Sequence, residues 1–224
     1  MSYCFDNKYE ELPESIPLFP LNKVLLLPRA KLPLNLFENR YLHMFDHALQ
    51  NGRYIGMIQP SEEPKKDGEM KPPSLYNVGC AGFLTAFSQT NDNRYEIVLN
   101  GLCRFKVIKE TNLLLGFRQA KVSWKFYKHD LDSHSNSNIS KRSEFEDKLK
   151  HYLKKINIDA DWQAIEASSD EDLVNSISMS CPFNKIEKQA LLESISIQDR
   201  MNVLTSLLDM SINENKGHQS SLIS

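Results

Sequence analysis

Short apolar runs separated by prolines and polar turns dominate residues 16–128, and this pattern predicts a mostly β structure. The strands are expected at 23–28, 31–37, 53–60, 78–89, 94–110 and 116–127, with a turn at 90–93. Pro20, Pro28 and Pro33 are expected to end strands or to confine them to sheet edges, because proline has no N–H to donate. Gly101 in the middle of a run indicates a bulge or a sharp bend. Many short, bent strands predict a curled sheet or a small barrel.

A helical period interrupts the predicted strands at residues 39–52. A helix there would place five apolar residues on one face: Tyr41, Met44, Phe45, Ala48 and Leu49. Gly52 follows at a position where helices commonly end. The segment therefore predicts one amphipathic helix among the strands.

Residues 143–210 carry helical spacing almost throughout. Helices are expected to begin where Ser or Asn precedes Glu or Asp by three residues, because such pairs satisfy the first backbone N–H groups. These pairs are Ser143 with Glu146, Asn184 with Glu187, and Ser196 with Asp199. Further helices are expected at 160–167 and from Ser169 onward.

Composition divides the chain into successive segments. Residues 1–15 are expected to be a loose leader and residues 16–128 a β-rich unit. The Ser- and Asn-rich stretch 129–142 is predicted to be a polar linker, 143–210 a helical bundle, and 211–224 a frayed tail. Strands followed by helices indicate an α+β protein.

The charge balance argues against a general binder of nucleic acids or acidic membranes. The 224 residues have a formal net charge of −2, with 41% hydrophobic and 25% charged residues, which are ordinary values for a globular protein. A local basic face could still support RNA binding, and it would be sought at Lys121, Lys125 and Lys128.

Targeting features and cysteines bear on the compartment. The N-terminal segment has no apolar stretch typical of a secretory signal, and no apolar run approaches the roughly 20 residues that cross a bilayer. Cys4, Cys80, Cys103 and Cys181 lie far apart without a CxxC pair. This pattern predicts reduced, inert thiols in a cytoplasmic protein that makes no membrane contact.

The chain lacks the short motifs of nucleotide-driven and hydrolytic enzymes, since GxxxxGK[ST], GxGxxG and GxSxG do not occur. His43 and His47 have the spacing of an HExxH metal motif, but Met44 stands in place of its glutamate. Two histidines flanking the buried face of a helix are the favoured interpretation. We therefore expect no cofactor, no metal and no catalytic residue.

Several blocks of sequence resemble the LON substrate-binding domain, the N-terminal domain of Lon protease. LFPLNKVLLLPRAKLPLNLFENRY at 18–41 is similar to the start of that domain. The VG pair at 78–79 and the LNGLCRF run at 99–105 are similar to its second block. KQALLE at 188–193 and DRMNVLTSLL at 199–208 are similar to its closing helices.

The resemblance covers roughly residues 16–210 and implies both a fold and a class of function. It implies a twisted β pseudo-barrel, similar to PUA-like domains, followed by a helical bundle. Lon protease adds an ATPase and a Ser–Lys proteolytic domain, and neither fits in this chain, so the sequence resembles the stand-alone LON-domain proteins of many bacteria. Arg29 and Ala30 depart from the family pattern, which commonly has glycine there.

The function that the resemblance implies is non-catalytic binding of an unfolded or partner polypeptide, with an adaptor role in protein quality control as one form. The alternatives are a peptidase in its own right, and RNA binding through the PUA-like barrel. Apolar and aromatic side chains are the expected contacts to a polypeptide: Leu36, Phe37, Tyr41, Met44 and Phe83. The competing interpretation is that these side chains form the core.

The remaining motif residues are assigned structural roles: Pro20, Pro33, Glu38, Arg40, Gly101, Arg104 and Phe105. Glu38, Arg40 and Arg104 are expected to form an ion pair or network that links the motif blocks, because arginine and carboxylate groups fix each other's geometry.

Overall fold

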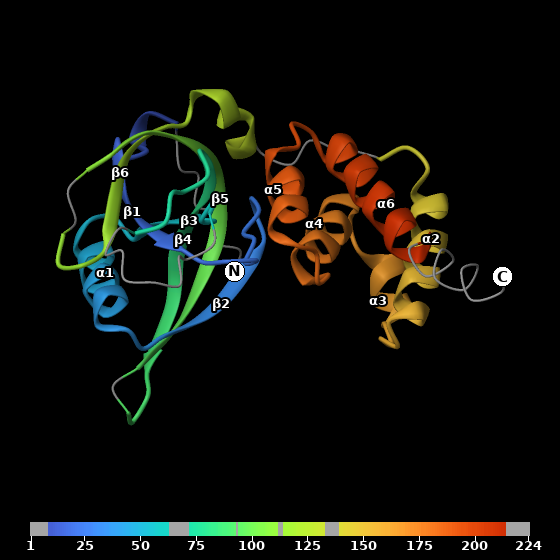
Figure 1. Ribbon diagram of the computed structural model, residues 1–224, viewed down its shortest axis with the longest axis horizontal. Coiled ribbons are helices and arrows are strands. Elements are labelled where there is room, and N and C mark those ends of the chain that lie inside the picture. The colour runs from blue at the N-terminus through green and yellow to red at the C-terminus, as the bar shows by residue number, and fades with distance from the viewer. Residues whose placement is uncertain (1–8, 63–71, 93, 112–113, 133–138, 214–224) are drawn as a thin grey trace, which may run out of the picture. The chain divides into compact units, whose positions relative to one another are not determined.

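Strands make up the first part of the chain and helices the second (Figure 1). The computed structural model describes residues 9–62, 72–92, 94–111, 114–132 and 139–213. The chain divides into two units, Met1–Ser133 and His134–Ser224. The predicted α+β class is confirmed, while the domain bounds derived from composition stay a prediction.

Six strands form one curled sheet in the order β2-β5-β4-β3-β1-β6, and β5 also pairs with β6, so that the pairing runs round in a ring. The strands are β1 (Ser15–Pro20), β2 (Lys31–Leu36), β3 (Tyr54–Ile58), β4 (Val78–Gln89), β5 (Tyr95–Glu110) and β6 (Arg118–Ser123). β1 and β3 run parallel, and the other neighbours run antiparallel. Two 3₁₀ helices, η1 (Tyr9–Glu11) and η2 (Lys125–Leu131), precede and follow the strands in sequence.

β5 is the longest strand and has three neighbours. Its residues 95–100 pair with β2 and its residues 106–110 pair with β6, while β4 pairs along 95–106. The register with β4 shifts beside Gly101, and the register with β6 shifts after Val107. These irregularities confirm the bulge predicted at Gly101, and bulges increase the twist that lets one strand serve two parts of a sheet.

The strand predicted at 23–28 is wrong, because this segment is irregular. Lys23 and Arg29 have positive φ angles of 61° and 65°, which interrupt extended backbone at both ends of the segment. The leucines between them are nevertheless buried: Leu25, Leu26 and Leu27. The apolar run therefore fills the core without joining the sheet.

Gly101 is the point where this irregular segment lies directly against β5. Its N–H donates to the carbonyl of Ala30 over 2.8 Å, and its carbonyl accepts from the N–H of Arg29 over 2.7 Å. A Cβ at this position would lie 1.9 Å from the carbonyl oxygen of Leu27. Only glycine allows so close an approach of two backbones.

Prolines occur inside two strands, at positions where a neighbouring strand is missing. β1 contains Pro17 and Pro20; its pairing with β6 ends at Leu18, where its pairing with β3 begins. Each of these prolines therefore has a sheet neighbour on one side only. β1 is a strand that sequence reasoning missed, because prolines argue against a strand inside a sheet.

The prediction that Pro33 lies in an edge strand is confirmed, since β2 lies at one end of the strand order. The Gly101 N–H donates to the Ala30 carbonyl, so the carbonyl of Ala30 points toward β5. Along an antiparallel strand every second residue points its N–H and C=O the same way, so those of Leu32, Leu34 and Leu36 also point toward β5. The nitrogen of Pro33 then faces away from β5.

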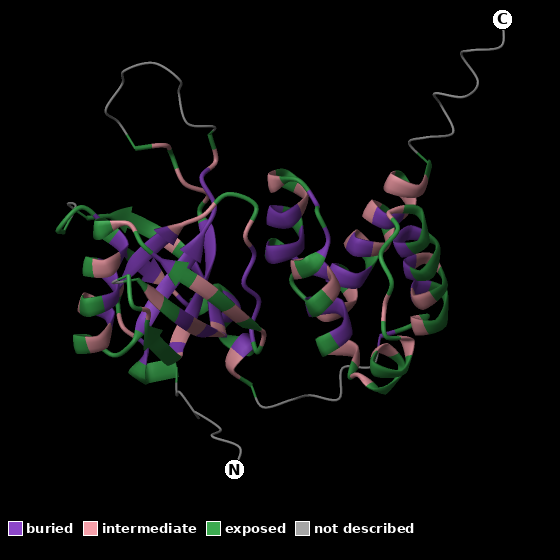
Figure 2. Cartoon of the chain, turned by 90° about the horizontal axis from the view of Figure 1, so that it is seen from below, coloured by how far each residue is buried: buried purple, intermediate pink, exposed green. Residues whose placement is uncertain are grey.

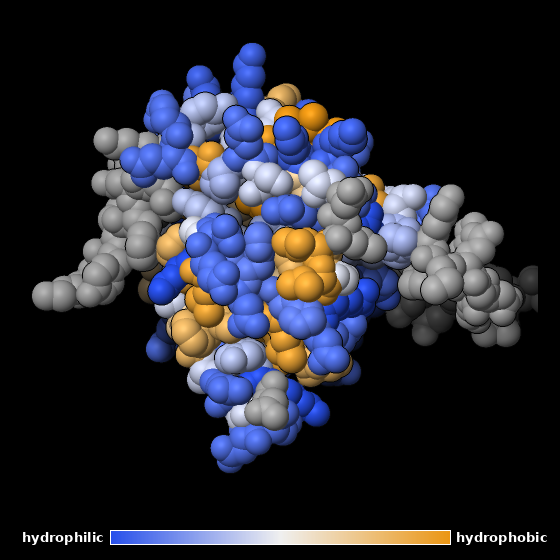
Figure 3. All heavy atoms as spheres, turned by 90° about the vertical axis from the view of Figure 1, so that its left-hand side faces the viewer, coloured by the Kyte–Doolittle hydropathy of each residue, from blue (hydrophilic) through white to orange (hydrophobic). Residues whose placement is uncertain are grey.

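α1 (Asn39–Gln50) packs its predicted apolar face on the sheet (Figure 2). Of the five residues expected on this face, Leu49 is half-buried. The other four are buried: Tyr41, Met44, Phe45 and Ala48. The Phe45 ring lies 4.5 Å from that of Tyr95 on β5, between centroids. The side that carries α1 and β6 in Figure 1 is mainly hydrophilic at the surface, with separate apolar patches (Figure 3).

The strand predicted at 116–127 is shorter than expected, because the chain leaves the sheet after Ser123 and turns into η2. The indole N–H of Trp124 donates to the Pro13 carbonyl over 2.9 Å, and Tyr127 is buried. η2 extends into the stretch that composition marks as a linker.

The second unit contains α2 (Arg142–Lys155), α3 (Trp162–Ala167), α4 (Asp170–Ser180), α5 (Lys185–Glu193) and α6 (Ile197–Asn213). The helix starts predicted at Asn184 and Ser196 are confirmed, each with reciprocal bonds to the acidic residue three positions on. The start predicted at Ser143 is wrong. α2 begins at Arg142, whose Nε–H donates to the carboxylate of Glu146 over 2.7 Å. Glu146, which would complete the predicted cap with Ser143, is therefore bound to Arg142 instead.

Two arginines join the helices through backbone carbonyls. Arg142 donates to the carbonyls of Ile165 and Ser168 and forms a 2.6 Å ion pair with Asp170. The buried Arg200 donates to the Leu191 carbonyl and to the Asn175 side chain, both over 2.9 Å. α6 continues to Asn213, into the stretch expected to be frayed; residues 214–224 lie outside the described part of the chain.

Replacement of Gly101 by alanine tests the close approach of the irregular segment to β5. We expect Gly101→Ala to lower the free energy of unfolding by about 3 kcal/mol, because backbone must move to admit the Cβ. Gly116→Ala is the control: Gly116 has a positive φ of 86°, which alanine disfavours, but a Cβ there would meet only the Cβ of Arg40, at 3.4 Å. It should cost about 1 kcal/mol in urea unfolding, and equal losses would contradict the interpretation.

Candidate functional site

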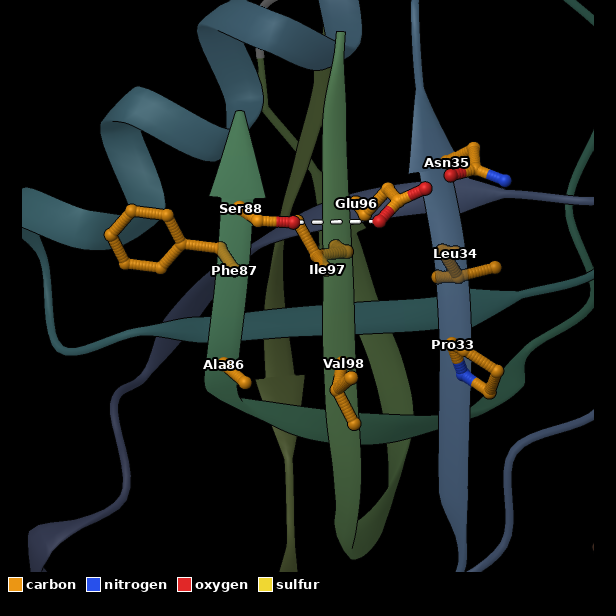
Figure 4. A pocket seen from close by; sticks show the side chains of 9 residues that line it. All are labelled: Pro33, Leu34, Asn35, Ala86, Phe87, Ser88, Glu96, Ile97 and Val98. Atoms are coloured by element: carbon orange, nitrogen blue, oxygen red, sulfur yellow. Dashed lines mark hydrogen bonds between the residues drawn. The ribbon is translucent and has the colours of Figure 1, made fainter. Parts of the chain in front are cut away.

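β2, β5 and β4 lie side by side, and their outward side chains form three cross-strand rows, two of which are drawn in Figure 4. The middle row is apolar and consists of Pro33, Val98 and Ala86. The row on one side is Asn35, Glu96 and Ser88, and the row on the other is Lys31, Asn100 and Phe83. We call these nine residues the outer face; it is an apolar strip between two mainly polar rows.

A groove of about 560 Å³ lies over this part of the sheet. Residues of the apolar row and of the Asn35 row line it, together with Leu34, Ile97 and Phe87. Pro33 and Ala86 are exposed and Val98 is half-buried, whereas Ile97 is buried. Phe87 turns its ring toward α1, where it packs edge-on against Phe45 at 5.2 Å (Figure 4). The groove therefore has an exposed apolar wall on a rigid sheet.

Aromatic side chains mark both ends of the outer face. Phe37 follows β2 directly and is 62% exposed, and the Arg94 guanidinium lies 5.8 Å from the centroid of its ring. Phe83, at the other end, is half-buried and packs edge-on against Tyr54 at 5.6 Å. Arg94 lies just before β5, and Asn100 is the last outer-face residue on that strand. The backbone between them is about 20 Å long, which matches roughly six residues of extended chain.

Polar groups beside the apolar row are held in place by local bonds. The Ser88 hydroxyl donates to Glu96 over 3.4 Å. Arg94 forms a 2.8 Å ion pair with Asp92, and a hydrogen bond from Thr90, with Arg94 nearby, lowers the pKa of the Asp92 carboxyl. The chemistry of the face is thus apolar contact flanked by fixed hydrogen-bonding groups, which suits binding of a chain with a polar backbone and apolar side chains.

The structure separates the five side chains predicted to contact a polypeptide. Phe37 and Phe83 lie at the ends of the outer face, and whether they bind a ligand stays a prediction. Leu36, Tyr41 and Met44 are buried, with Tyr41 packed on Phe19 at 4.3 Å, so they match the alternative in which they form core. Sequence reasoning missed the apolar row, because only strand register brings Pro33, Val98 and Ala86 together.

The network expected to link the motif blocks is instead two separate pairs. Glu38 and Arg40 form an exposed 2.7 Å pair. Arg104 is buried and binds Asp130 through its Nε at 2.8 Å, its Nη2 at 2.7 Å and its backbone N–H at 2.9 Å. Nothing in the sequence pattern pointed to Asp130, since it falls in the stretch marked as a linker. Phe105, another motif residue, is fully buried and packs edge-on against Trp124, which agrees with its structural assignment.

The described cysteines are buried thiols. Burial raises the pKa of the Cys103 thiol, with Asp130 nearby acting in the same direction. Burial also raises the pKa of the Cys181 thiol to about 11, against the opposing effects of Lys188 and Tyr152. A thiol with such a pKa is almost entirely protonated near neutral pH and is a poor nucleophile.

The histidine pair of α1 takes part in local contacts. The Nδ1 of His43 donates to the Leu115 carbonyl over 3.1 Å, and the ring of His47 lies 5.4 Å from that of Phe117. Within the described ranges, no three His, Cys, Asp or Glu side chains gather as a metal site would require. In the same ranges, no helix has the length and apolar character of a membrane span.

Comparison with known proteins assigns the family. The model of the ATP-dependent protease La (LON) substrate-binding domain matches residues 15–210. The chain is 24% identical over 211 residues to Lon protease of Syntrophus aciditrophicus, covering 91% of this chain and 26% of that protein. It is 25% identical over 199 residues to Lon protease of Buchnera aphidicola, covering 88% and 25%. The chain therefore belongs to the LON substrate-binding domain family, and it spans about a quarter of the length of these relatives.

Solved structures show the same fold. The Lon N-terminal domain protein from Xanthomonas campestris has a TM-score of 0.57 at 22% identity, covering 86% of this chain and 97% of that one. The N-terminal domain of Mycobacterium avium complex Lon protease has a TM-score of 0.61 at 13% identity, covering 87% and 98%. The fold implied by the sequence resemblance is thus confirmed.

Removal of one partner tests the buried Arg104–Asp130 pair. Arg104→Met leaves a buried carboxylate without its cation, so we expect the free energy of unfolding to fall by about 3–5 kcal/mol. Arg40→Met breaks the exposed pair with Glu38 and should cost at most about 1 kcal/mol. Urea unfolding measures both, and a loss for Arg104→Met as small as that for Arg40→Met would contradict the assigned role.

Thiol labelling tests the burial of the cysteines. In the folded protein at pH 8, iodoacetamide should leave Cys80, Cys103 and Cys181 almost unmodified, because all three are buried and burial raises the pKa of the Cys103 and Cys181 thiols. All three should react rapidly in concentrated urea. Peptide mass spectrometry resolves each site, and rapid native labelling of any of the three would show that its surroundings open.

Proposed function

We propose that the outer face binds extended, unfolded polypeptide. The observation that carries the proposal is the apolar row Pro33–Val98–Ala86, exposed along three rigid strands and bounded by polar rows and two aromatic side chains. Membership of a substrate-binding domain family supports a role in recognition. Exposed apolar surface rimmed by polar residues is typical of protein interaction sites.

The shape of the face favours a segment of extended chain. Measured along β5, the outer face together with Arg94 is about 20 Å long, so it accepts a segment of roughly six extended residues that crosses the apolar row. An unfolded polypeptide presents such segments where a folded protein hides them. The free edge of β2 is a poor place to add a strand, because the nitrogen of Pro33 faces it without a proton. Side-chain contacts across the strands therefore carry the binding.

The proposed role is non-catalytic: the protein holds a polypeptide, as an adaptor in protein quality control would, and leaves it uncleaved. The partner is an unfolded or partly unfolded protein in the cytoplasm. Peptide-bond cleavage by the purified protein, lost on substitution of a single Ser or Lys, would instead support the peptidase alternative.

Binding of an unfolded protein tests the proposed function directly. A small protein destabilised by substitution and its folded parent differ in folding and hardly in composition, so both are labelled and titrated by fluorescence anisotropy. We expect the unfolded form to bind and the folded parent to bind much more weakly. Val98→Glu should weaken binding of the unfolded form about tenfold, because it places a charge in the apolar row.

The matched control for Val98→Glu is Ile186→Glu on α5, where an apolar side chain that is 71% exposed also gains one charge. It should leave the affinity unchanged. Equal affinity for the folded and unfolded proteins, or full binding by Val98→Glu, would contradict the proposed function.

A further inference from the structure

A second surface is formed by the other half of β5, where it pairs with β6. Lys106 lies opposite Ser123, and Lys109 lies opposite Lys121. Val107 and Val122 alternate with these residues, and Val122 is buried. The three lysines therefore point outward from the ribbon of two strands.

The lysines near this ribbon lack carboxylate partners within the described part of the chain. Among the residues that the structure describes, none of five lysines forms an ion pair: Lys106, Lys109, Lys121, Lys125 and Lys128. We call these five residues the lysine face. The arginines of the same strands are paired: Arg118 binds Glu110 and Arg104 binds Asp130.

Lys109 and Lys121 add an unfavourable element, because like charges directly opposite on neighbouring strands repel each other. Neither ammonium group has an ion-pair partner among the described residues that would offset this repulsion. An anionic ligand placed between the two groups would remove the repulsion and gain two favourable contacts.

Apolar groups accompany the charges. Ile108 lies in the bulge of β5 between Val107 and Lys109, and its side chain is 66% exposed. Phe126 is 53% exposed, and the Nζ of Lys106 lies 3.8 Å from the centroid of its ring. A ligand that fits this surface combines negative charge with apolar side chains.

Two classes of macromolecule combine these features, and the charge of the whole chain distinguishes them. A nucleic-acid binder holds many phosphates and shows a broad basic excess, whereas this chain has a net charge of −2. The lysine face also lacks the planar arginine forks that bind phosphate in two-point contact. A short acidic segment needs only a few ammonium groups in one place.

We propose that the lysine face binds acidic polypeptide segments in which carboxylate and large apolar side chains alternate or adjoin. This proposal rests on the proposed function, since it gives polypeptide recognition a second, charge-selective contact. β5 supplies both surfaces: its residues 95–100 carry the outer face and its residues 106–110 carry part of the lysine face.

The test uses two labelled, unstructured peptides with the same apolar residues. One peptide carries glutamates, and the other has glutamine at each of those positions. The full chain should bind the acidic peptide about tenfold more tightly at low salt, and the difference should shrink as salt screens the charges. The substitutions K109E/K121E should abolish the preference and leave the affinity for the glutamine peptide unchanged.

The control pair is K150E/K154E on α2, which makes the same change of net charge at exposed lysines of the other unit. It should keep the preference for the acidic peptide. Equal binding of the two peptides by the unaltered chain, or a preference that survives K109E/K121E, would overturn the lysine-face proposal. Failure to bind either peptide would instead count against the proposed function itself.

Oligouridylate serves as the nucleic-acid probe. Weak binding relative to the acidic peptide is expected. If oligouridylate binds more tightly than the acidic peptide and K109E/K121E removes that binding, the surface is a nucleic-acid site and the polypeptide proposal is wrong.

A single substitution separates a binding role from a structural one. K109E alone replaces a repulsive pair with an attractive one, so it should raise the urea midpoint of unfolding while it lowers affinity for the acidic peptide. A fall in the midpoint would show that Lys109 supports the fold, and would contradict its assignment to ligand binding.

Discussion

The buried pair between Arg104 and Asp130 fixes the strand on which both surfaces depend. The carboxylate of Asp130 accepts hydrogen bonds from the Nε, the Nη2 and the backbone N–H of Arg104. The backbone carbonyl of Asp130 accepts a hydrogen bond from the Arg29 side chain over 2.7 Å. One aspartate therefore joins β5, the irregular segment before β2, and η2. The Arg104 guanidinium also lies 4.3 Å from the ring centroid of the buried Tyr127. Close by, Gly101 lets the irregular segment touch β5. These contacts hold β5 where it changes partners, from β2 in its first half to β6 in its second.

Local sequence patterns predicted the features that local chemistry decides. The caps at Asn184 and Ser196, the buried face of α1, and the edge position of Pro33 all follow from residue type and spacing, and all are confirmed. The features that failed depend on distant residues. The run 23–28 has the composition of a strand, yet it stays outside the sheet although it touches β5, because positive φ angles at Lys23 and Arg29 interrupt its extended backbone. Register, which no local pattern reveals, creates both the apolar row and the Lys109–Lys121 pair, and the partner of Arg104 lies beyond any recognisable motif.

The division of β5 into two halves gives the proposed recognition of polypeptides two chemical components. The first half supports an apolar strip of fixed shape, whose contacts depend on burial and are insensitive to salt. The second half supports positive charge that no described carboxylate neutralises, and contacts to this charge are expected to weaken with salt and to favour acidic sequences. A polypeptide ligand that has both kinds of side chain would gain from both surfaces, while a purely apolar segment would use the first alone. Both surfaces therefore belong to a chain of the LON substrate-binding domain family.

Hydrogen exchange of the full chain, with and without a permanently unfolded protein, tests polypeptide binding at the outer face most directly. We expect slower exchange in peptides that cover 31–37 and 83–100 when the unfolded protein is present, with the helices of the second unit unchanged. Protection confined to residues 142–213, or no protection at concentrations where binding is measured, would contradict the assignment of polypeptide recognition to the outer face.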